Sequence, residues 1–297
     1  MSTFGTRLRV AALAAGTVVL IAACGSSSSS TSSSSAPAAS STSSAAASST
    51  SSAAASSGKT YVIITSADFP PFSSRSASDP NTIVGFEPDM MKAVMGHLGW
   101  KYKWVTADFS GLIPAVQSGR ADMVVSDVYD TSTREKVVDF TDYLKTALSL
   151  MVTSSNASKV HGFMDTCGKP LGILTGAATE LQFATQASDA CKKAGKPAID
   201  IHSFSEVAEE VPALQNGNLY AMFEDTITEH LIANKQPNFK VVYDDPQAAT
   251  PLGIAIKKGS PIEAQLKSGM QWYLSSPEYK STATKWGLPA SALLSSP

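Results

Sequence analysis

The ten residues from Ser126 to Glu135 combine residue types that suit anion binding. They follow the apolar run Met123–Val125, which is typical of a strand buried on both faces. Ser132 with Glu135 three residues later is a capping-box pattern and predicts that a helix begins here, with either of the two residues before Ser132 as an alternative cap. A helix N-terminus exposes unpaired N–H groups, and Arg134 adds a planar fork of donors suited to a carboxylate. The stretch therefore predicts an anion site at a strand's end; the alternative is an ordinary capped helix whose arginine pairs with a surface aspartate.

The N-terminus predicts export from the cytoplasm. Arg7 and Arg9 precede an apolar run, Val10–Ala23, that is too short to span a bilayer but fits the central region of a secretory signal. The run ends in Leu-Ile-Ala-Ala-Cys at Cys24, which resembles the bacterial lipobox, where the cysteine is lipidated and becomes the mature N-terminus. We therefore expect a signal peptide over residues 1–23 and lipidation of Cys24. A plain signal peptide with an incidental cysteine is the alternative.

Residues 24–58 predict a flexible tether. After Cys24 they are almost entirely serine, alanine and threonine, so they lack the apolar surface needed to offset the entropy of ordering. A flexible chain of this length has an end-to-end distance of about 30 Å. We expect it to hold a folded domain clear of the outer face of the cell membrane.

Composition excludes several classes of partner for the remaining chain. The formal net charge is −2 and no Lys/Arg run follows the signal, so nucleic acid is not expected. Cys167 and Cys191 are predicted to form a disulfide, because exported proteins keep such bonds; two buried free thiols are the alternative. The four histidines lack metal-ligand spacing, so neither a metal nor a cofactor is predicted.

Strand and helix patterns alternate twice along the chain, which predicts an α/β fold with parallel-type sheets. The first alternation starts at Tyr61 and the second at Leu171, while the tail after Leu252 offers one strand and two helices, too little to bury a core alone. We therefore expect lobe 1 to comprise residues 59–152 and 250–297, with lobe 2, residues 153–249, inserted into it. The two crossovers, near residues 151–155 and 244–251, would be hinges beside a cleft.

Four motifs together carry a family resemblance. They are Gly85-Phe86-Glu87-Pro88-Asp89, the run Asp108–Gly119, the run Thr131–Arg134 and the ending Lys285-Trp286-Gly287-Leu288. From about Tyr61 to Leu288 the chain resembles the family 3 solute-binding proteins of bacterial ABC importers, the polar amino-acid binders. The resemblance implies the type II periplasmic-binding fold, closure of two lobes on a small polar solute such as an amino acid or a related amine or carboxylate, and delivery to the importer's membrane subunits by a monomeric protein.

The resemblance also implies roles for single residues. Arg134 would clamp the ligand's α-carboxylate, and Asp225 would receive its α-ammonium, although a strand-end aspartate equally suits the cap of a helix starting at Thr226. The aromatic rings of Phe69 and Phe109 would form opposite walls of the site. The predicted ligand-binding set is Phe69, Phe109, Ser126, Asp127, Tyr129, Arg134, Ala178 and Asp225.

Three departures from the family pattern bear on the ligand. Asp127 stands where the family has Gly or Ser, Tyr129 where it has Ser or Thr, and Ala177 with Ala178 replaces a pair of hydroxyl residues. An unpaired buried carboxylate is costly, so our hypothesis is that Asp127 meets a cationic group of the ligand. Pairing with a nearby lysine or with a helix N-terminus is the alternative.

Two other function classes share this pattern. Exported enzymes such as cyclohexadienyl dehydratases and some lytic transglycosylases use the same fold, and the cleft is expected to hold several carboxyl groups. The sequence shows no Ser nucleophile elbow, Cys–His pairing or His-Glu-x-x-His motif, so we do not expect an enzyme. A sensory lipoprotein that takes no part in transport is the other alternative.

Overall fold

The structure is a computed structural model that describes residues 58–297, without the side chains of residues 246–248. The predicted signal peptide, the lipidated Cys24 and all but the last residue of the tether lie outside the described residues. Over residues 58–297 no helix is both long and apolar enough to cross a bilayer.

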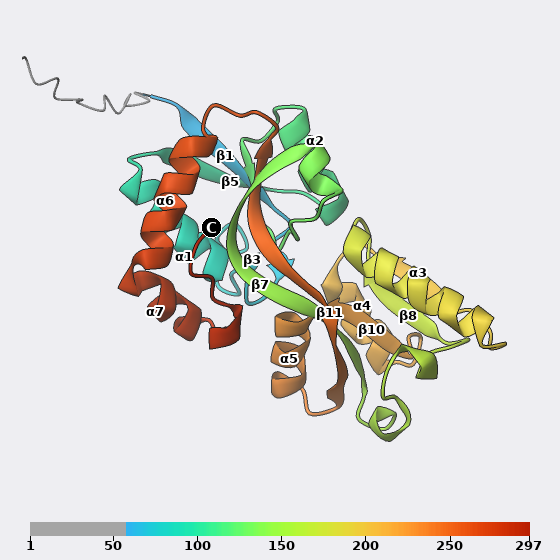
Figure 1. The fold of residues 1–297 in the computed structure, drawn as a ribbon. Coiled ribbons are helices and arrows are strands. Elements are labelled where there is room, and N and C mark those ends of the chain that lie inside the picture. Colours follow the sequence, from blue (N-terminus) through green and yellow to red (C-terminus); the bar gives the residue numbers. More distant parts are fainter. Residues whose placement is uncertain (1–57) are drawn as a thin grey trace, which may run out of the picture. The chain divides into compact units, whose positions relative to one another are not determined.

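Eight strands form one continuous mixed sheet (Figure 1). In spatial order they are β5 (Lys101–Thr106), β1 (Thr60–Thr65), β6 (Met123–Val124), β11 (Phe239–Lys257), β7 (Val138–Thr153), β10 (Ala221–Asp225), β8 (Pro170–Leu174) and β9 (Asp200–Phe204). The outer strands pair in parallel, β1 with β5 and β6, and β8 with β9 and β10. The two central strands, β7 and β11, are antiparallel to each other and to their outer neighbours. The expected parallel pairing is therefore present in the outer strands, whereas the central pair is antiparallel.

The long strands β7 and β11 join two lobes, which Figure 1 shows on either side of them. At one end β11 pairs with β6 through Ala255 and Ile256, and at the other end β7 pairs with β10 through residues 148–151. The strand expected in the tail after Leu252 is not separate, because it continues from residues of lobe 2 as β11, with a register shift between Asp245 and Thr250. We call the part with β5, β1 and β6 lobe 1, and the part with β10, β8 and β9 lobe 2. Their exact limits and the hinge positions stay predictions.

The chain's tail packs on lobe 1, as the sequence predicted. Lobe 1 contains α1 (Phe86–His97), α2 (Leu112–Gln117), α6 (Glu263–Ser275) and α7 (Pro277–Lys285). Helices α6 and α7 lie against α1 (Figure 1), and their contact buries Met90, Met95, Tyr273 and Tyr279 almost completely. Burying each such side chain contributes about 1.5–3 kcal/mol, so the tail completes a core that the first segment leaves open.

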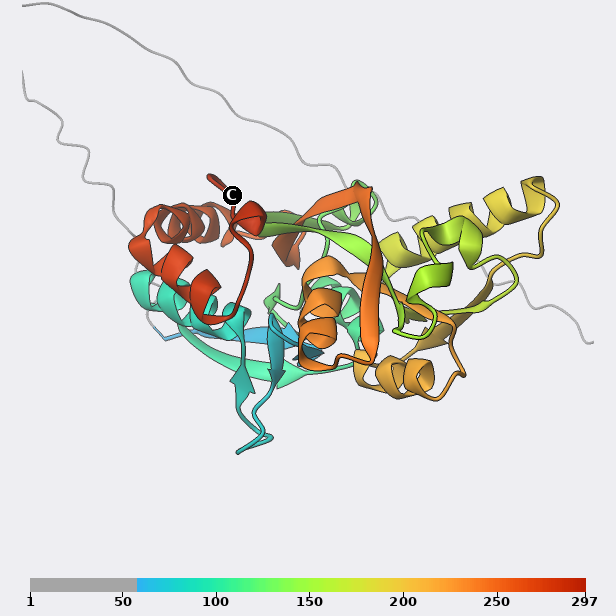
Figure 2. The same cartoon turned by 90° about the horizontal axis from the view of Figure 1, so that it is seen from below.

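Lobe 2 is built from α3 (Ala178–Lys193), α4 (Val207–Gln215) and α5 (Thr226–Lys235) around its three strands (Figures 1 and 2). Cys167 and Cys191 form the expected disulfide, which ties α3 to the segment before β8. Two short features of lobe 1 face the cleft. They are a three-stranded sheet of β2 (Asp68–Phe69), β3 (Ser73–Arg75) and β4 (Ile83–Val84), and the turn η1 (Phe109–Gly111).

No α-helix begins at Ser132, so that prediction was wrong. The chain after β6 instead runs along β11, where Tyr129 forms a bridge with Leu252. Because β7 already starts at Val138, only a single 3₁₀ turn, η2 (Arg134–Lys136), fits between the two. The hydroxyl oxygen of Thr131, rather than that of Ser132, accepts the N–H of Arg134 at 3.3 Å.

Candidate ligand-binding site

A cavity of about 10 Å³ lies between the two lobes, beside the C-terminal ends of β6 and β8. A space of this size holds about one water molecule, so the lobes are closed on each other. The residues that line it are Phe69, Phe109, Asp127, Tyr129 and Arg134 from lobe 1, and Ala177, Thr179 and Glu180 from lobe 2. The cleft expected from the sequence is therefore present, and both lobes supply its walls.

Arg134 is the only cation that lines this cavity among the described residues. Its side chain is buried, with one terminal nitrogen donating to the carbonyl oxygen of Tyr129 at 3.0 Å and the other to that of Gly176 across the cleft at 3.4 Å. The guanidinium lies 5.9 Å from the centre of the Phe109 ring, within the range of a cation–π contact. These contacts fix the guanidinium in the cleft, as the sequence predicted, and keep it away from bulk water.

Asp127 has a left-handed backbone with φ of 50°, a conformation that aspartate tolerates better than most residues. Its N–H donates to the Glu87 carboxylate at 2.7 Å, and Tyr143 donates its hydroxyl to the same oxygen. The Asp127 side chain is only 3% exposed, and its Oδ1 has no hydrogen-bond partner among the described residues. Burial raises the pKa of this carboxyl well above its ordinary value, and Asp225 raises it further. A buried acceptor thus faces the cavity without a donor.

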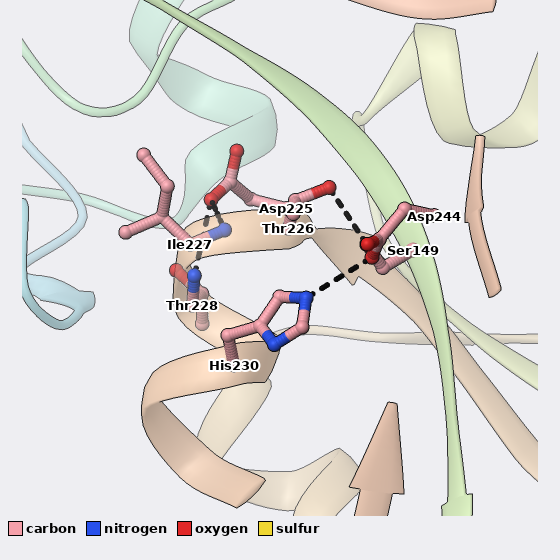
Figure 3. Close-up of polar contacts among 7 residues, drawn as sticks. All are labelled: Ser149, Asp225, Thr226, Ile227, Thr228, His230 and Asp244. Carbon is pink, nitrogen blue, oxygen red and sulfur yellow. Dashed lines mark hydrogen bonds and ion pairs between the residues drawn. The ribbon is translucent and has the colours of Figure 1, made fainter. Parts of the chain in front are cut away.

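Asp225 ends β10 and caps α5 (Figure 3). Its Oδ1 accepts the N–H groups of Ile227 at 2.8 Å and Thr228 at 3.1 Å. Its Oδ2 accepts the hydroxyl of Tyr129 from lobe 1 at 3.0 Å. The structure therefore confirms the capping role, and the same carboxylate reaches the edge of the cavity through the Tyr129 hydroxyl.

Aromatic rings close the cavity on the lobe 1 side. The rings of Phe69 and Phe109 are tilted against each other with centroids 6.1 Å apart, and both side chains are buried. The small sheet holds Phe69 in place and η1 holds Phe109. The Tyr129 hydroxyl, which also lies 3.0 Å from the carbonyl oxygen of Ala147, adds a polar edge to this wall.

A row of buried carboxyl groups runs from the cavity into lobe 2. Glu180, in the first turn of α3, accepts the N–H of Leu174 at 3.0 Å. Behind it lie Glu224 and Glu210, which are also buried. Burial raises the pKa of each of the three carboxyls well above its ordinary value, and the neighbouring carboxyls raise it further. Burial and mutual repulsion thus favour the protonated forms of this row.

A serine, an aspartate and a histidine meet beside α5, but not as an activated nucleophile. Ser149 donates its hydroxyl to Asp244 at 2.7 Å and also contacts the Thr226 hydroxyl at 2.7 Å (Figure 3). His230 contacts the same Asp244 oxygen at 3.1 Å. A nucleophilic serine needs a base as its direct partner, whereas Ser149 is bonded to the carboxylate instead. The network ties α5 to β7 and β11 next to the cap of Asp225.

Sequence reasoning located most of this site. Of the predicted set, the structure brings Phe69, Phe109, Asp127, Tyr129 and Arg134 to the cavity, and Asp225 joins them through Tyr129. Ser126 and Ala178 do not line it. The Ser126 hydroxyl oxygen accepts the N–H of Ser66 at 3.0 Å, and Ala178 is exposed at the start of α3.

Glu180 is a lining residue that sequence reasoning missed. The available signal was its position in the first turn of α3, directly after the glycine turn at Gly176. A glutamate there reads as an ordinary exposed residue favoured by the helix dipole. Its burial depends on β8 and β10, which the local sequence does not reveal.

The family model of the bacterial extracellular solute-binding proteins, family 3, matches residues 61–289. The chain belongs to this family. As a family 3 protein it resembles the arginine-binding protein ArgT of Corynebacterium glutamicum, with 24% identity over 74% of this chain and 71% of that one. It also resembles the arginine-binding extracellular protein ArtP of Bacillus subtilis, with 27% identity over 77% of this chain and 86% of that one.

Solved structures give the same assignment for this family 3 protein. An ancestral arginine-binding protein bound to arginine matches with a TM-score of 0.69 and 27% identity, over 76% of this chain and 97% of that one. The ancestral amino acid-binding protein AncCDT-1, a precursor of cyclohexadienyl dehydratase, matches with a TM-score of 0.65 and 28% identity, over 76% of this chain and 95% of that one. The two-lobe α/β fold is thus the type II periplasmic-binding fold, as the resemblance implied.

Proposed function

We propose that this family 3 protein is a lipoprotein that captures a small polar solute, an amino acid or a related amine or carboxylate, between its lobes. The observation that carries the proposal is the buried guanidinium of Arg134, which faces a cavity walled by both lobes together with two aromatic rings and buried carboxyl groups. Charged groups with few protein partners and flat apolar walls are the parts from which small-molecule sites are built. The names of the relatives, which bind arginine, favour a ligand of the amino-acid class.

The site residues of this proposal are those that face the cavity or its edge. Phe69, Phe109 and Tyr129 supply the walls, and Arg134, Asp127 and Asp225 supply the charged groups that orient the solute. A solute that touches both lobes favours the closed state by its difference in affinity for the two states. The membrane subunits of an ABC importer would then recognise the closed form and receive the solute.

Localisation in this proposal follows from the N-terminal sequence. Lipidation at Cys24 would anchor a monomer to the outer face of the cell membrane, with residues 24–58 as the tether. We expect the folded part to work near the importer without crossing the membrane itself.

A thermal-shift screen of the purified full chain in mild detergent tests the binding function. Amino acids, amines and small carboxylates are added one at a time, and a solute present at a hundredfold its Kd is expected to add about 2.7 kcal/mol of stability. Chemically denatured protein with the same solutes controls for effects on the dye. If no member of the three classes shifts the unfolding temperature, the proposal of solute capture is wrong.

A further inference from the structure

Tyr129 of lobe 1 reaches across the cleft and contacts Asp225 of lobe 2. Its hydroxyl donates to Oδ2 of Asp225 at 3.0 Å, and the tyrosine is 4% exposed. Arg134 and the Thr228 hydroxyl also donate across the cleft, but to backbone carbonyl oxygens at the longer distances of 3.4 and 3.3 Å. Of these three contacts, the one from Tyr129 is the shortest and the one that ends on a carboxyl group.

The acceptor strengthens this contact between the lobes. Burial raises the pKa of Asp225 to about 6, so the carboxyl is ionised at about pH 7.5. A hydrogen bond to an ionised acceptor is roughly twice as strong as one between neutral groups. Oδ1 of the same carboxylate accepts the N–H groups of Ile227 and Thr228, so the start of α5 holds the carboxylate in place. The hydroxyl therefore meets a fixed and charged acceptor when the lobes are together.

The Tyr129 hydroxyl has a second acceptor at the same distance. The carbonyl oxygen of Ala147 also lies 3.0 Å from it. Ala147 lies on β7 opposite the register shift of β11, so this acceptor belongs to the strands that connect the lobes. A hydroxyl carries one proton and donates fully to one acceptor at a time. It can therefore leave Asp225 for Ala147 without losing its hydrogen bond.

The hydroxyl uses an oxygen that suits a solute. An amino acid or an amine carries an ammonium group, for which an ionised carboxylate is a strong acceptor. Oδ2 of Asp225 is such an acceptor at the edge of the cavity that Tyr129 lines. Because this cavity of about 10 Å³ holds about one water molecule, an ammonium beside Oδ2 would take the space in which the hydroxyl lies. Tyr129 and the solute are thus competitors for one position.

We propose that Tyr129 is a gating residue, whose hydroxyl holds the lobes together through Asp225 in the solute-free protein and turns to Ala147 when a solute takes Oδ2. The solute step rests on the proposed function, whereas the contact between the lobes does not depend on it. Opening of the cleft breaks the bond to Asp225, because the two residues lie on different lobes. Removing the hydroxyl should therefore favour open lobes and make it easier for a solute to enter.

Tyr129→Phe tests the contact between the lobes without any solute, because it keeps the ring and removes the hydroxyl. Spin labels on Lys92→Cys in α1 and Lys193→Cys in α3, both exposed positions, report the distance between the lobes by double electron–electron resonance. The full chain is dialysed free of solute in mild detergent. We expect the ratio of open to closed lobes to rise about tenfold, since a hydrogen bond to a charged group has about that effect. An unchanged distance distribution overturns the inference.

Solute affinity tests the competition. Isothermal titration calorimetry uses the solute from the thermal-shift screen that stabilises the parent protein most. Tyr129→Phe should bind it about three- to tenfold more tightly, because a larger fraction of the solute-free protein is open to it. Weaker binding would show that the hydroxyl contacts the solute, and equal binding that it does not compete; either result overturns the gating role.

The two measurements keep the inference separate from the proposed function. If Tyr129→Phe opens the lobes but no solute binds, the contact between the lobes is supported and solute capture is wrong. If a solute binds while the lobes of Tyr129→Phe stay closed, solute capture stands and the gating role is wrong.

Two further variants separate gating from a general effect on folding. Tyr279→Phe is the matched control, because it removes a buried tyrosine hydroxyl that donates to the carbonyl oxygen of Tyr143 at 2.6 Å within lobe 1. It should leave the lobe distance and the affinity unchanged, and an effect equal to that of Tyr129→Phe overturns the inference. Asp225→Asn changes the other side of the contact and should also open the solute-free lobes, because the hydroxyl loses its charged acceptor. Circular dichroism checks folding, and closed lobes in folded Asp225→Asn likewise contradict the proposal.

Discussion

Asp225 makes two separable contributions, and a pair of substitutions distinguishes them. Its Oδ1 accepts two N–H groups at the start of α5, and its Oδ2 accepts the Tyr129 hydroxyl at the edge of the cavity. Asparagine keeps an oxygen for the two N–H groups and is as good a cap as aspartate, but it has no charge. Alanine removes the cap and the charge together.

The expected magnitudes follow from these contacts. Asp225→Ala leaves two buried N–H groups without an acceptor, so the free energy of unfolding should fall by about 1–3 kcal/mol. Asp225→Asn should change it by less than about 1 kcal/mol, because its carbonyl oxygen replaces Oδ1 and the Tyr129 hydroxyl can still donate to Ala147. Both variants should bind a cationic solute about tenfold or more weakly than the parent protein, since each loses a charge-assisted contact.

Urea unfolding followed by circular dichroism measures stability, and calorimetry with the strongest solute from the screen measures affinity. Tyr129→Phe is a useful companion, because it keeps the ring and removes only the hydroxyl bonded to Asp225. If Asp225→Asn folds and binds like the parent protein, Asp225 is a helix cap and nothing more. If Asp225→Ala is as stable as the parent protein, the cap is not important for folding.

Three other changes have expected outcomes. Cys24→Ser should release the chain from the membrane fraction and abolish labelling by an alkyne fatty acid; a variant that stays labelled would contradict anchoring at this cysteine. Replacing Cys167 and Cys191 together by alanine should lower the free energy of unfolding by about 3 kcal/mol, measured by urea unfolding. An unchanged urea midpoint would contradict a stabilising role of the disulfide. Burial raises the pKa of Asp142 to about 6 from 3.8, so its ionisation destabilises the fold increasingly as pH rises from about 4 to 6 and fully above that. Asp142→Asn should therefore raise Tm at about pH 7.5 and leave it unchanged at about pH 4, whereas an equal shift at both would refute the assignment to this carboxyl.

The element types could be predicted from the sequence because they depend on local patterns. The helix expected to start at Thr226 is α5, Thr226–Lys235, and the two helices expected in the tail are α6, Glu263–Ser275, and α7, Pro277–Lys285. The continuity of β7 and β11 could not be predicted, since polar residues such as Asp142, Lys145 and Asp244 interrupt the apolar pattern. Those residues are accommodated because the two strands pair with each other between the lobes. This pairing joins segments about 100 residues apart in the chain, so the local sequence does not reveal it.

The site residues could likewise be predicted only where local sequence determines their position. Arg134 was located by its residue type and its distance from a strand, even though the helix expected around it is a single 3₁₀ turn. Glu87 shows what local sequence cannot provide, since it lies 40 residues before Asp127 and fixes that residue's backbone through one hydrogen bond. Burial of Glu180 and Glu224 depends likewise on how α3 packs against β8 and β10.

The closed cleft implies that a solute must compete with contacts that the lobes already make. Arg134 donates to Gly176, Tyr129 to Asp225, and the Thr228 hydroxyl to the carbonyl oxygen of Pro70, each across the gap. A cavity of about 10 Å³ holds no amino acid or diamine, so the lobes must separate before either can enter. The measured free energy of binding is then the favourable free energy of the solute's contacts with the site, reduced by the free energy needed to break or share these three contacts. Because Tyr129 uses the same Asp225 oxygen that a ligand ammonium would use, it is the contact most directly exchanged for the ligand.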